Sequence, residues 1–456
     1  MERNITAGTS IQQIQGTGGA DALPSVGKKE ILVVPVEFSD FPFQDGLFSK
    51  LDLLFNGNAT DGTTGYWESV CSFYKKSSYG KLDMHMTIAD IYKPVYAKTG
   101  KQYVTSNITS YVDTLDILRL AVANYKETTS TDCKQFDSDS NGFIDSVYLV
   151  YSAPDYLELP TLNHDAFWAF TYWDYTQTAN KENPIGNSYF WVSVDFMDEK
   201  GKGIVDAHTF IHETGHLLGA EDYYNYRGTS QPLGGLDMMD YNIGDHNLWT
   251  KMEYGWVDPI VVTGNAKVTI KTSQLAGDVI LLAPDGWNNT PFDEMITLEM
   301  YSPTGLNLLD ATSPYQGVFP LQYTKPGIKA LHADSRLMDS EFHYRTTTAI
   351  GEDSDHIYFA ACNTDDYTST QEGRNHSPEN FYQLGLLQAG KKATCLSQNS
   401  ISTDGDLFQA GQAFNMEDYP EFFKSYPTLD NGKTLPYEFY VESMDADQAT
   451  IVIQRV

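Results

Sequence analysis

The segment 204–220 has the strongest helical pattern in the chain, and it carries two histidines at helical spacing. Residues four positions apart lie on the same face of an α-helix, so His212 and His216 present their imidazoles to one side. Glu213 directly follows His212, and Gly219 lies three residues after His216. Glycine lets the backbone leave a helix through a left-handed conformation. The pattern therefore predicts a helix that ends in a sharp turn.

Two imidazoles on one helix face can bind a single zinc ion, and the turn can bring a third ligand back to the metal. Asp222, six residues after His216, is the predicted third ligand, and Glu221 is its nearest rival. Glu213 can lie beside the metal without binding it and accept a proton from the metal's water. We therefore predict a zinc site of His212, His216 and Asp222, with Glu213 as the general base.

Two other residues offer alternative third ligands. His208 lies four residues before His212, on the same helix face, although a buried or supporting role is the simpler interpretation. Glu253 can supply the glutamate that another class of zinc site takes from a later helix. The turn after Gly219 argues against this scheme, because it already provides a ligand locally.

A glycine-rich segment about twenty residues after the helix contains Met239 and Tyr241. A methionine turn beneath the metal is a mark of metzincin sites, so Met239 is predicted to pack there. Tyr241 is a candidate hydrogen-bond donor to a tetrahedral oxyanion, with a purely structural role as the alternative. Before the helix, the segment 189–196 alternates like an edge strand, which can hold an extended peptide by β-augmentation.

The loop 137–145 has the pattern DxDxNGxxD, with oxygen-bearing side chains at alternate positions and glycine at the sixth. A flexible calcium loop needs this arrangement. The twelfth position is Tyr148 rather than glutamate and a strand pattern follows, so the loop is not a paired EF-hand. An Asx-rich turn without an ion is the alternative. The predicted calcium ligands are Asp137, Asp139, Asn141, the backbone carbonyl of Phe143, and Asp145.

The charge balance excludes several classes of partner. The chain has 61 acidic and 30 basic residues, a formal net charge of -31. Such a surface repels phosphate backbones, so no nucleic-acid partner is expected, and an anionic membrane is disfavoured in the same way. No apolar run approaches the ~20 residues of a transmembrane segment. The first residues lack the apolar core of a signal peptide, so the chain is either cytosolic or secreted with its leader removed.

Hydrophobic patterning divides the chain into three parts. Residues 1–28 are polar and lack periodicity, which predicts a flexible N-terminal arm. Residues 29–258 mix strand and helix patterns, which predicts an α/β (α+β) domain that contains the zinc helix. Residues 259–456 carry short strand patterns between turn residues, which predicts a mostly β C-terminal domain. In the first strand, Pro35 indicates a bulge or a sheet edge. The expected strands are 31–38, 82–88, 146–152, 266–272, 278–283, 295–300, 357–361, 439–442 and 449–454, and the other expected helices are 67–76 and 113–126.

The four cysteines are too few and too scattered for a disulfide scaffold or a zinc ribbon, so we expect free buried thiols or one incidental disulfide. They are Cys71, Cys133, Cys362 and Cys395.

Several weaker motifs follow one another in order along the chain. They are Phe38-Ser39-Asp40, Tyr74 with Ser78-Tyr79-Gly80-Lys81-Leu82, the loop 137–145, Gly234 or Gly235 with Asp237 and Met239, Lys251 with Gly255 and Trp256, and His332-Ala333-Asp334. Together with the HExxHxxGxxD pattern of residues 212–222, they resemble the immune inhibitor A-like metallopeptidases, a family of secreted bacterial enzymes. The chain departs from the family in two places: its arm is shorter than the usual inhibitory prosegment, and Trp168 is not soon followed by a histidine.

The resemblance implies a metzincin-like catalytic domain, a β-rich C-terminal part, an extracellular setting and often bound calcium. It also implies that His212, His216 and Asp222 are the zinc ligands and Glu213 the general base. We therefore expect a secreted zinc endopeptidase, acting as a monomer on protein or peptide substrates. The alternative is a catalytically weak protein- or glycan-binding surface protein that keeps the fold. The intact Glu213 argues against a binding-only role, and most of the 30 tyrosines and 7 tryptophans are expected in the core.

Overall fold

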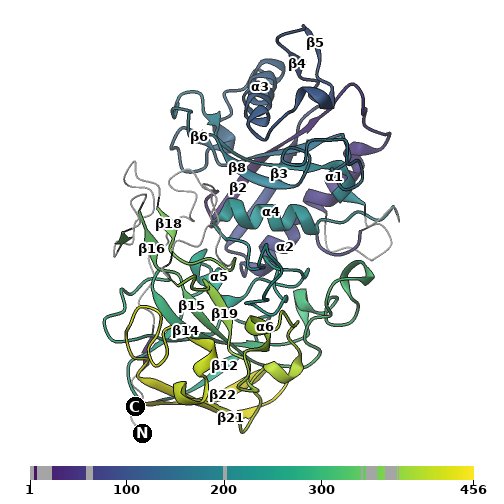
Figure 1. The fold of residues 1–456 in the computed structure, drawn as a ribbon. Coiled ribbons are helices and arrows are strands. Elements are labelled where there is room, and N and C mark those ends of the chain that lie inside the picture. The colour runs from purple at the N-terminus through teal and green to yellow at the C-terminus, as the bar shows by residue number, and fades with distance from the viewer. Residues whose placement is uncertain are drawn as a thin grey trace. The chain divides into compact units, whose positions relative to one another are not determined.

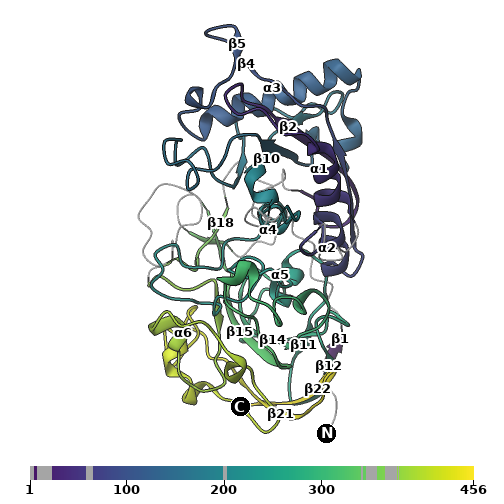
Figure 2. The same cartoon turned by 90° about the vertical axis from the view of Figure 1, so that its right-hand side faces the viewer.

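The computed structural model describes residues 5–7, 23–57, 65–198, 203–339, 343–345, 357–364, 377 and 379–456 (Figures 1 and 2). The chain divides into two compact units, which we call the 20–219 unit and the 220–456 unit, the latter including residues 1–19. Across the described ranges, we find no helix with both the length and the apolar character needed to span a membrane.

The division after residue 219 differs from the domain boundary that the sequence predicts after residue 258. Contacts of the intervening segment explain the difference. The Asn363 side chain donates a hydrogen bond to the carbonyl of Tyr223 at 2.9 Å, and the backbone N–H of Leu248 donates to Glu299. The segment that joins the helix of His212 and His216 to the β-rich part thus bonds with residues far along the chain.

A five-stranded sheet in the order β3-β2-β7-β10-β8 forms the centre of the 20–219 unit. The parallel strands are β3 (Leu82–Ile88), β2 (Gly27–Val36), β7 (Val147–Tyr151) and β10 (Ser188–Ser193). The last strand, β8 (Phe170–Trp173), is antiparallel to β10. All residues of β7 and β10 are buried, as expected for a sheet that is covered on both faces.

Helices cover both faces of this sheet (Figure 1). The helix α3 (Val112–Thr129) shares a hydrophobic core with alternate residues of β7 and β10. On the opposite face, Phe55 packs on Tyr148, and Phe210 packs on Phe190 with ring centroids 5.8 Å apart. The helices on that face are α1 (Leu47–Asn56), α2 (Val70–Ser77) and α4 (His208–Leu218).

The segment 189–196 does not form the predicted edge strand, and of the two alternatives predicted for Pro35, a bulge or a sheet edge, the structure excludes the sheet edge. The strand predicted at the edge, 189–196, begins as β10, which lies between β7 and β8 and gives way to a 3₁₀ turn at Val194–Met197. The strand that ends the sheet beside it is β8. Pro35 lies in β2, an interior strand, and its carbonyl accepts a hydrogen bond from the N–H of Tyr92 at 2.8 Å. The pattern of hydrophobic and polar residues along a strand does not determine which strands become its neighbours in the sheet.

The helix α4 starts later than the predicted segment 204–220. Val205 forms isolated β-bridges with two other segments, so its backbone is extended rather than helical. The Asp206 side chain then accepts the backbone N–H of His208 at 2.9 Å, which satisfies one of the donors left unpaired at a helix start.

Two large sheets form most of the described 220–456 unit, in the orders β1-β11-β13-β14-β15-β19 and β12-β22-β21-β20, beside a small sheet β17-β16-β18. The two sheets lie against each other in Figure 2. Buried side chains from both sheets form one hydrophobic core. The first sheet consists of β1 (Ile5–Ala7), β11 (Ile260–Val262), β13 (Val279–Leu282), β14 (Glu294–Tyr301), β15 (Gly327–Asp334) and β19 (Leu384–Leu386). The second consists of β12 (Ala266–Lys271), β22 (Gln448–Arg455), β21 (Tyr437–Met444) and β20 (Ala413–Phe414). The expectation of a mostly β part after residue 259 is confirmed, and the predicted strands there lie within a few residues of the observed ones.

Smaller elements complete the two units. In the 20–219 unit they are β4 (Val95–Tyr96), β5 (Lys101–Gln102), β6 (Phe143–Ile144) and β9 (Ile185–Gly186). In the 220–456 unit they are β16 (Leu337–Met338), β17 (Tyr344–Arg345), β18 (Tyr358–Phe359), α5 (Leu248–Glu253) and α6 (Thr394–Ser397). All four cysteines are free thiols.

The predicted flexible arm contains a strand. Residues 1–4 and 8–22 lie outside the described part of the chain, but Ile5–Ala7 pairs antiparallel with β11. Residues 27 and 28 already belong to β2. The flexible-arm prediction is therefore wrong for these residues, because their hydrogen bonds are made with segments distant in sequence.

Gly219 ends α4 in a left-handed conformation with a φ of 118°. Its N–H bonds to the carbonyls of Gly215 and His216 at 3.1 and 2.9 Å, which closes the last turn. An L-residue is strained at this φ. The glycine predicted from sequence to end the helix is thus required by the backbone.

Replacing Gly219 with alanine should destabilise the protein by about 1–2 kcal/mol, because the new Cβ opposes the left-handed backbone. The shift of the urea-unfolding midpoint measures this loss. Gly390→Ala is the matched control: a Cβ there meets open space and its φ is not in the left-handed region. Its midpoint should stay within about 0.5 kcal/mol of wild type. Equal shifts in the two variants would contradict the argument.

Candidate metal centre

Two of the three histidines of α4, His212 and His216, are the candidate ligands and lie on its less buried face. His212 and His216 are half-buried, whereas Phe210, Ile211 and Leu217 are buried in the 20–219 unit. The Nε2 atoms of the two histidines are 3.2 Å apart. Ligand atoms on a tetrahedral zinc ion at 2.0–2.1 Å are separated by roughly 3.3 Å. The imidazole pair therefore fits zinc without a change of backbone.

Asp222 completes a group of three possible metal ligands in one short stretch of chain. A carboxylate oxygen of Asp222 and a ring nitrogen of each histidine all lie within 4.8 Å of one another. The turn at Gly219 makes this proximity a local property of the backbone. The Tyr226 hydroxyl donates a hydrogen bond to Asp222 Oδ2 at 2.5 Å, which orients the carboxylate. Tyr226 was not predicted, although its position four residues after the aspartate was visible in the sequence.

Among the described residues, the alternative ligands His208, Glu221 and Glu253 do not belong to this group. Glu253 is a buried residue of α5. His208 is the first residue of α4, and its ring centroid is 6.4 Å from that of His212. Glu221 precedes Asp222 and is not a member either. The donor set of two imidazoles and Asp222 agrees with the prediction from spacing.

Glu213 has a buried side chain that is held by a residue sequence reasoning missed. Thr171 Oγ1 donates to Glu213 Oε2 at 2.9 Å and also contacts the Glu213 carbonyl at 3.0 Å. Thr171 belongs to β8, the strand that ends the sheet. The contact joins residues 42 positions apart, so no local spacing could have revealed it. It fixes the orientation of the carboxylate in the 20–219 unit.

Met239 is fully buried, and its carbonyl accepts the backbone N–H of Tyr223 at 2.8 Å. Tyr223 follows Asp222 directly, so the methionine loop holds the backbone beside the predicted third ligand. Tyr241 is half-buried and its ring stacks on Tyr224 with centroids 5.6 Å apart. Its role as an oxyanion donor stays a prediction.

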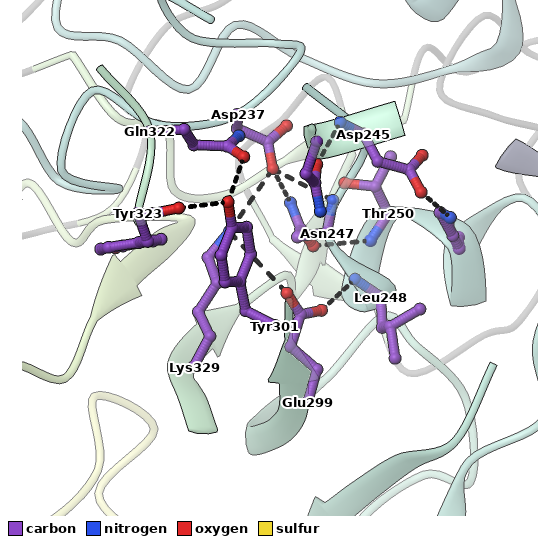
Figure 3. Close-up of polar contacts among 12 residues, drawn as sticks. Asp237, Asp245, Asn247, Leu248, Thr250, Glu299, Tyr301, Gln322, Tyr323 and Lys329 are labelled. Atoms are coloured by element: carbon purple, nitrogen blue, oxygen red, sulfur yellow. Dashed lines mark hydrogen bonds and ion pairs between the residues drawn. The ribbon is translucent and has the colours of Figure 1, made fainter. Parts of the chain in front are cut away.

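A buried network of charges supports the methionine loop (Figure 3). The Asp237 carboxylate accepts the backbone N–H of Met239 at 3.1 Å and both the backbone N–H and the side-chain amide of Asn247 at 3.0 Å. Lys329 Nζ, from β15, lies 3.7 Å from Asp237 and 3.9 Å from Glu299. Burial raises the pKa of both carboxyl groups, and the Lys329 cation opposes that shift. The network joins the loop to β14 and β15.

The predicted calcium loop gathers its aspartates as expected. Carboxylate oxygens of Asp137, Asp139 and Asp145 lie within 4.8 Å of one another. The backbone N–H of Asn141 donates to Asp137 and Asp139 at 3.1 and 3.0 Å. The Asn141 side-chain oxygen accepts the N–H of Phe143 at 2.7 Å, so this predicted ligand atom also bonds the backbone.

Asp145 gives the strongest indication that the loop fits a cation. Its Oδ1 accepts the N–H of Ser138 at 3.0 Å, whereas its buried Oδ2 has no hydrogen-bond partner among the described residues. Burial raises the pKa of Asp145 to about 6. Gly142 has a φ of 100°, and a Cβ there would meet the Asn180 backbone nitrogen at 2.8 Å. The unpartnered oxygen beside other carboxylates is suited to Ca²⁺.

Comparison with known proteins finds no matching protein-family model and no matching curated protein. The likeness to the immune inhibitor A-like metallopeptidases therefore rests on the sequence motifs alone. The identities of both metal ions, the catalytic role of Glu213 and the substrate remain proposals.

Replacing Lys329 with methionine should cost about 3–5 kcal/mol, because it leaves Asp237 and Glu299 as buried carboxylates without their cation. The control is Lys391→Met, which breaks a 2.6 Å pair with Asp418 on the exposed surface. That loss should be at most about 1 kcal/mol. Urea unfolding of the two variants measures the difference. A loss no larger for Lys329 than for Lys391 would mean that the buried network is not stabilising.

Added calcium should stabilise the wild-type protein. With the affinity of ~10⁻⁴–10⁻³ M common to extracellular calcium modules, 10 mM Ca²⁺ should add about 1.4–2.7 kcal/mol. Thermal unfolding in CaCl₂ compared with MgCl₂ at the same concentration measures the specific effect. Asp145→Asn should abolish most of it, whereas the exposed neighbour variant Asp132→Asn should keep it. Equal melting temperatures in the two salts would show that the loop is an ion-free turn.

Proposed function

We propose that this protein is a zinc-dependent endopeptidase that hydrolyses peptide bonds of proteins. The observation that carries the proposal is the grouping of His212, His216 and Asp222, with the facing imidazole nitrogens 3.2 Å apart. Glu213 adds a buried carboxylate on the same helix, oriented by Thr171. A binding-only protein would have no need of that carboxylate.

In this proposal His212, His216 and Asp222 hold zinc, which when bound polarises the scissile carbonyl and acidifies a water molecule. Glu213 acts as the general base and then as the general acid: it takes a proton from the attacking water and delivers it to the leaving amine. The hydrogen bond from Thr171 keeps the carboxylate directed for both transfers. Tyr241 is the candidate donor to the developing oxyanion.

The strand β8 is the candidate peptide-binding edge. It ends its sheet, and an extended peptide can add to a terminal strand through main-chain hydrogen bonds. Thr171 of β8 also contacts Glu213. A peptide bound along β8 would therefore pass close to the general base. This replaces the expected role of the interior strand β10.

The excess of acidic over basic residues and the motif resemblance support a secreted, extracellular peptidase. A protein or peptide is the proposed substrate, and the monomer is the proposed active form.

Glu213→Gln should keep the zinc at His212, His216 and Asp222 but lose cleavage by a factor of about 10²–10⁴, because the amide cannot accept the proton. His216→Ala should lose both cleavage and one zinc ion per chain. Mass spectrometry measures zinc content directly and cleavage as new termini in a peptide library made from denatured proteins.

Glu221→Gln is the matched control for these variants, because it changes the carboxylate directly before Asp222. It should keep both zinc and cleavage. Undiminished cleavage by Glu213→Gln, or wild-type zinc content in His216→Ala, would contradict the proposed function.

A further inference from the structure

A second group of metal-binding side chains lies within the 220–456 unit. It consists of Glu294 on β14, His332 on β15 and Asp430 in the loop before β21. One ligand atom from each residue lies within 4.8 Å of the other two. His332 Nε2 and Glu294 Oε1 are 2.7 Å apart. These three residues have no part in the proposed catalytic chemistry.

The strand register places the first two ligands together. In the antiparallel pair of β14 and β15, Ile296 is opposite His332 and Glu294 is opposite Asp334. Glu294 and His332 are therefore diagonal neighbours on one face of the sheet. Both side chains are buried, and the ring of Phe423 packs on His332 with centroids 4.9 Å apart. The imidazole and the carboxylate are thus held by the sheet and by the core.

The loop before β21 supplies the third ligand and also orients the first. The backbone N–H groups of Asp430 and Asn431 donate to the two oxygens of Glu294, each at 2.6 Å. The Asp430 carboxylate in turn accepts the N–H of Ser425 at 3.2 Å. Hydrogen bonds of this kind orient the carboxylates that bind metals. Glu294 Oε2 and the Asp430 carboxylate keep lone pairs for a cation, whereas Glu294 Oε1 accepts the N–H of Asp430 and contacts His332 Nε2.

The local charges favour a divalent ion. The nearby Asp334 forms a two-point ion pair with Arg336 at 2.7 Å, so those two charges are matched. Glu294 and Asp430 then face a single imidazole, that of His332. Two ionised carboxylates, a neutral imidazole and one divalent cation have no net charge. Without the cation, the buried carboxylates are poorly compensated.

A small cavity of about 10 Å³, close to the space that one water molecule needs, borders His332 and Asp430. Gly385 and Leu386 of β19 form part of its wall. Lys424 also lines the cavity, but its Nζ lies 4.2 Å from the centre of the Tyr382 ring and bonds a backbone carbonyl.

We propose that Glu294, His332 and Asp430 form a second metal site, for a divalent ion of the zinc type. One imidazole with two carboxylates suits zinc, whereas calcium prefers oxygen ligands alone. The bound ion would join β14, β15 and the loop before β21. The site is structural and does not depend on the proposed peptidase activity.

Zinc counted by mass spectrometry after exhaustive dialysis tests this site. The wild type should hold two zinc ions per chain, His216→Ala one, and the double variant His216→Ala/His332→Gln none. His343→Gln, which changes an exposed histidine of the same unit, is the control and should not alter the count. A His216→Ala variant without zinc would overturn the proposal and leave Glu294 and His332 as an ordinary buried ion pair.

A milder variant keeps the test valid if His332→Gln does not fold. In Asp430→Asn the new side chain can still accept the N–H of Ser425, so circular dichroism should match the wild type. In the His216→Ala background, this variant should bind zinc at least ten-fold more weakly. Unchanged affinity would also refute the site. Failure of the peptidase proposal alone has a different result. The wild type would then not cleave protein, while His216→Ala would still retain zinc and His216→Ala/His332→Gln would lose it.

Discussion

The loop that contains Met239, beside the candidate metal centre, depends on the interactions of the buried Asp237 carboxylate. It accepts hydrogen bonds from the methionine loop and from Asn247, next to the start of α5, while its charge is opposed by Lys329. Through Met239 and Tyr223 the same loop reaches the backbone beside Asp222. The buried ion pair of Asp237 and Lys329 thus fixes the position of the glycine-rich loop that contains Met239. Its loss would leave charges in the interior that water cannot solvate.

The candidate site combines two kinds of support. The histidines need only the regular geometry of α4, since helical spacing alone brings their nitrogens together. Asp222, the proposed third ligand, lies after a turn, and the Tyr226 hydroxyl orients its carboxylate. Glu213, the proposed general base, depends on a strand, because Thr171 of β8 fixes its carboxylate. The proposed ligands, which are near in sequence, are therefore placed by backbone geometry, whereas the proposed base is oriented by a residue distant in sequence.

Much of the local structure could be predicted from sequence. The spacing of His212 and His216, the glycine that ends the helix and the strand at Leu82–Ile88 all follow from short-range rules. The order of strands could not be predicted: β10 is interior and β8 ends the sheet. The roles of Thr171 and Lys329 were missed for the same reason, because their partners lie far away in sequence.

The group of Glu294, His332 and Asp430 likewise depends on contacts between residues that are distant in sequence. His332 and Asp334 were visible as a short motif, but Glu294 comes from the preceding strand and Asp430 from a loop much later in the chain. Only the antiparallel register and the folded loop bring the three together. A metal site assembled in this way has no signature in any one stretch of sequence.

The pairing of β1 with β11 has a consequence for the order of events during synthesis. At about 5–20 residues per second, a ribosome needs roughly 13 to 50 s after making Ile5–Ala7 to complete Ile260–Val262. Within that interval the whole of 20–219 has been translated, and its sheet needs no strand from later in the chain. The strand β1 must therefore wait for β11, its partner, while about 200 residues that follow it find their own partners.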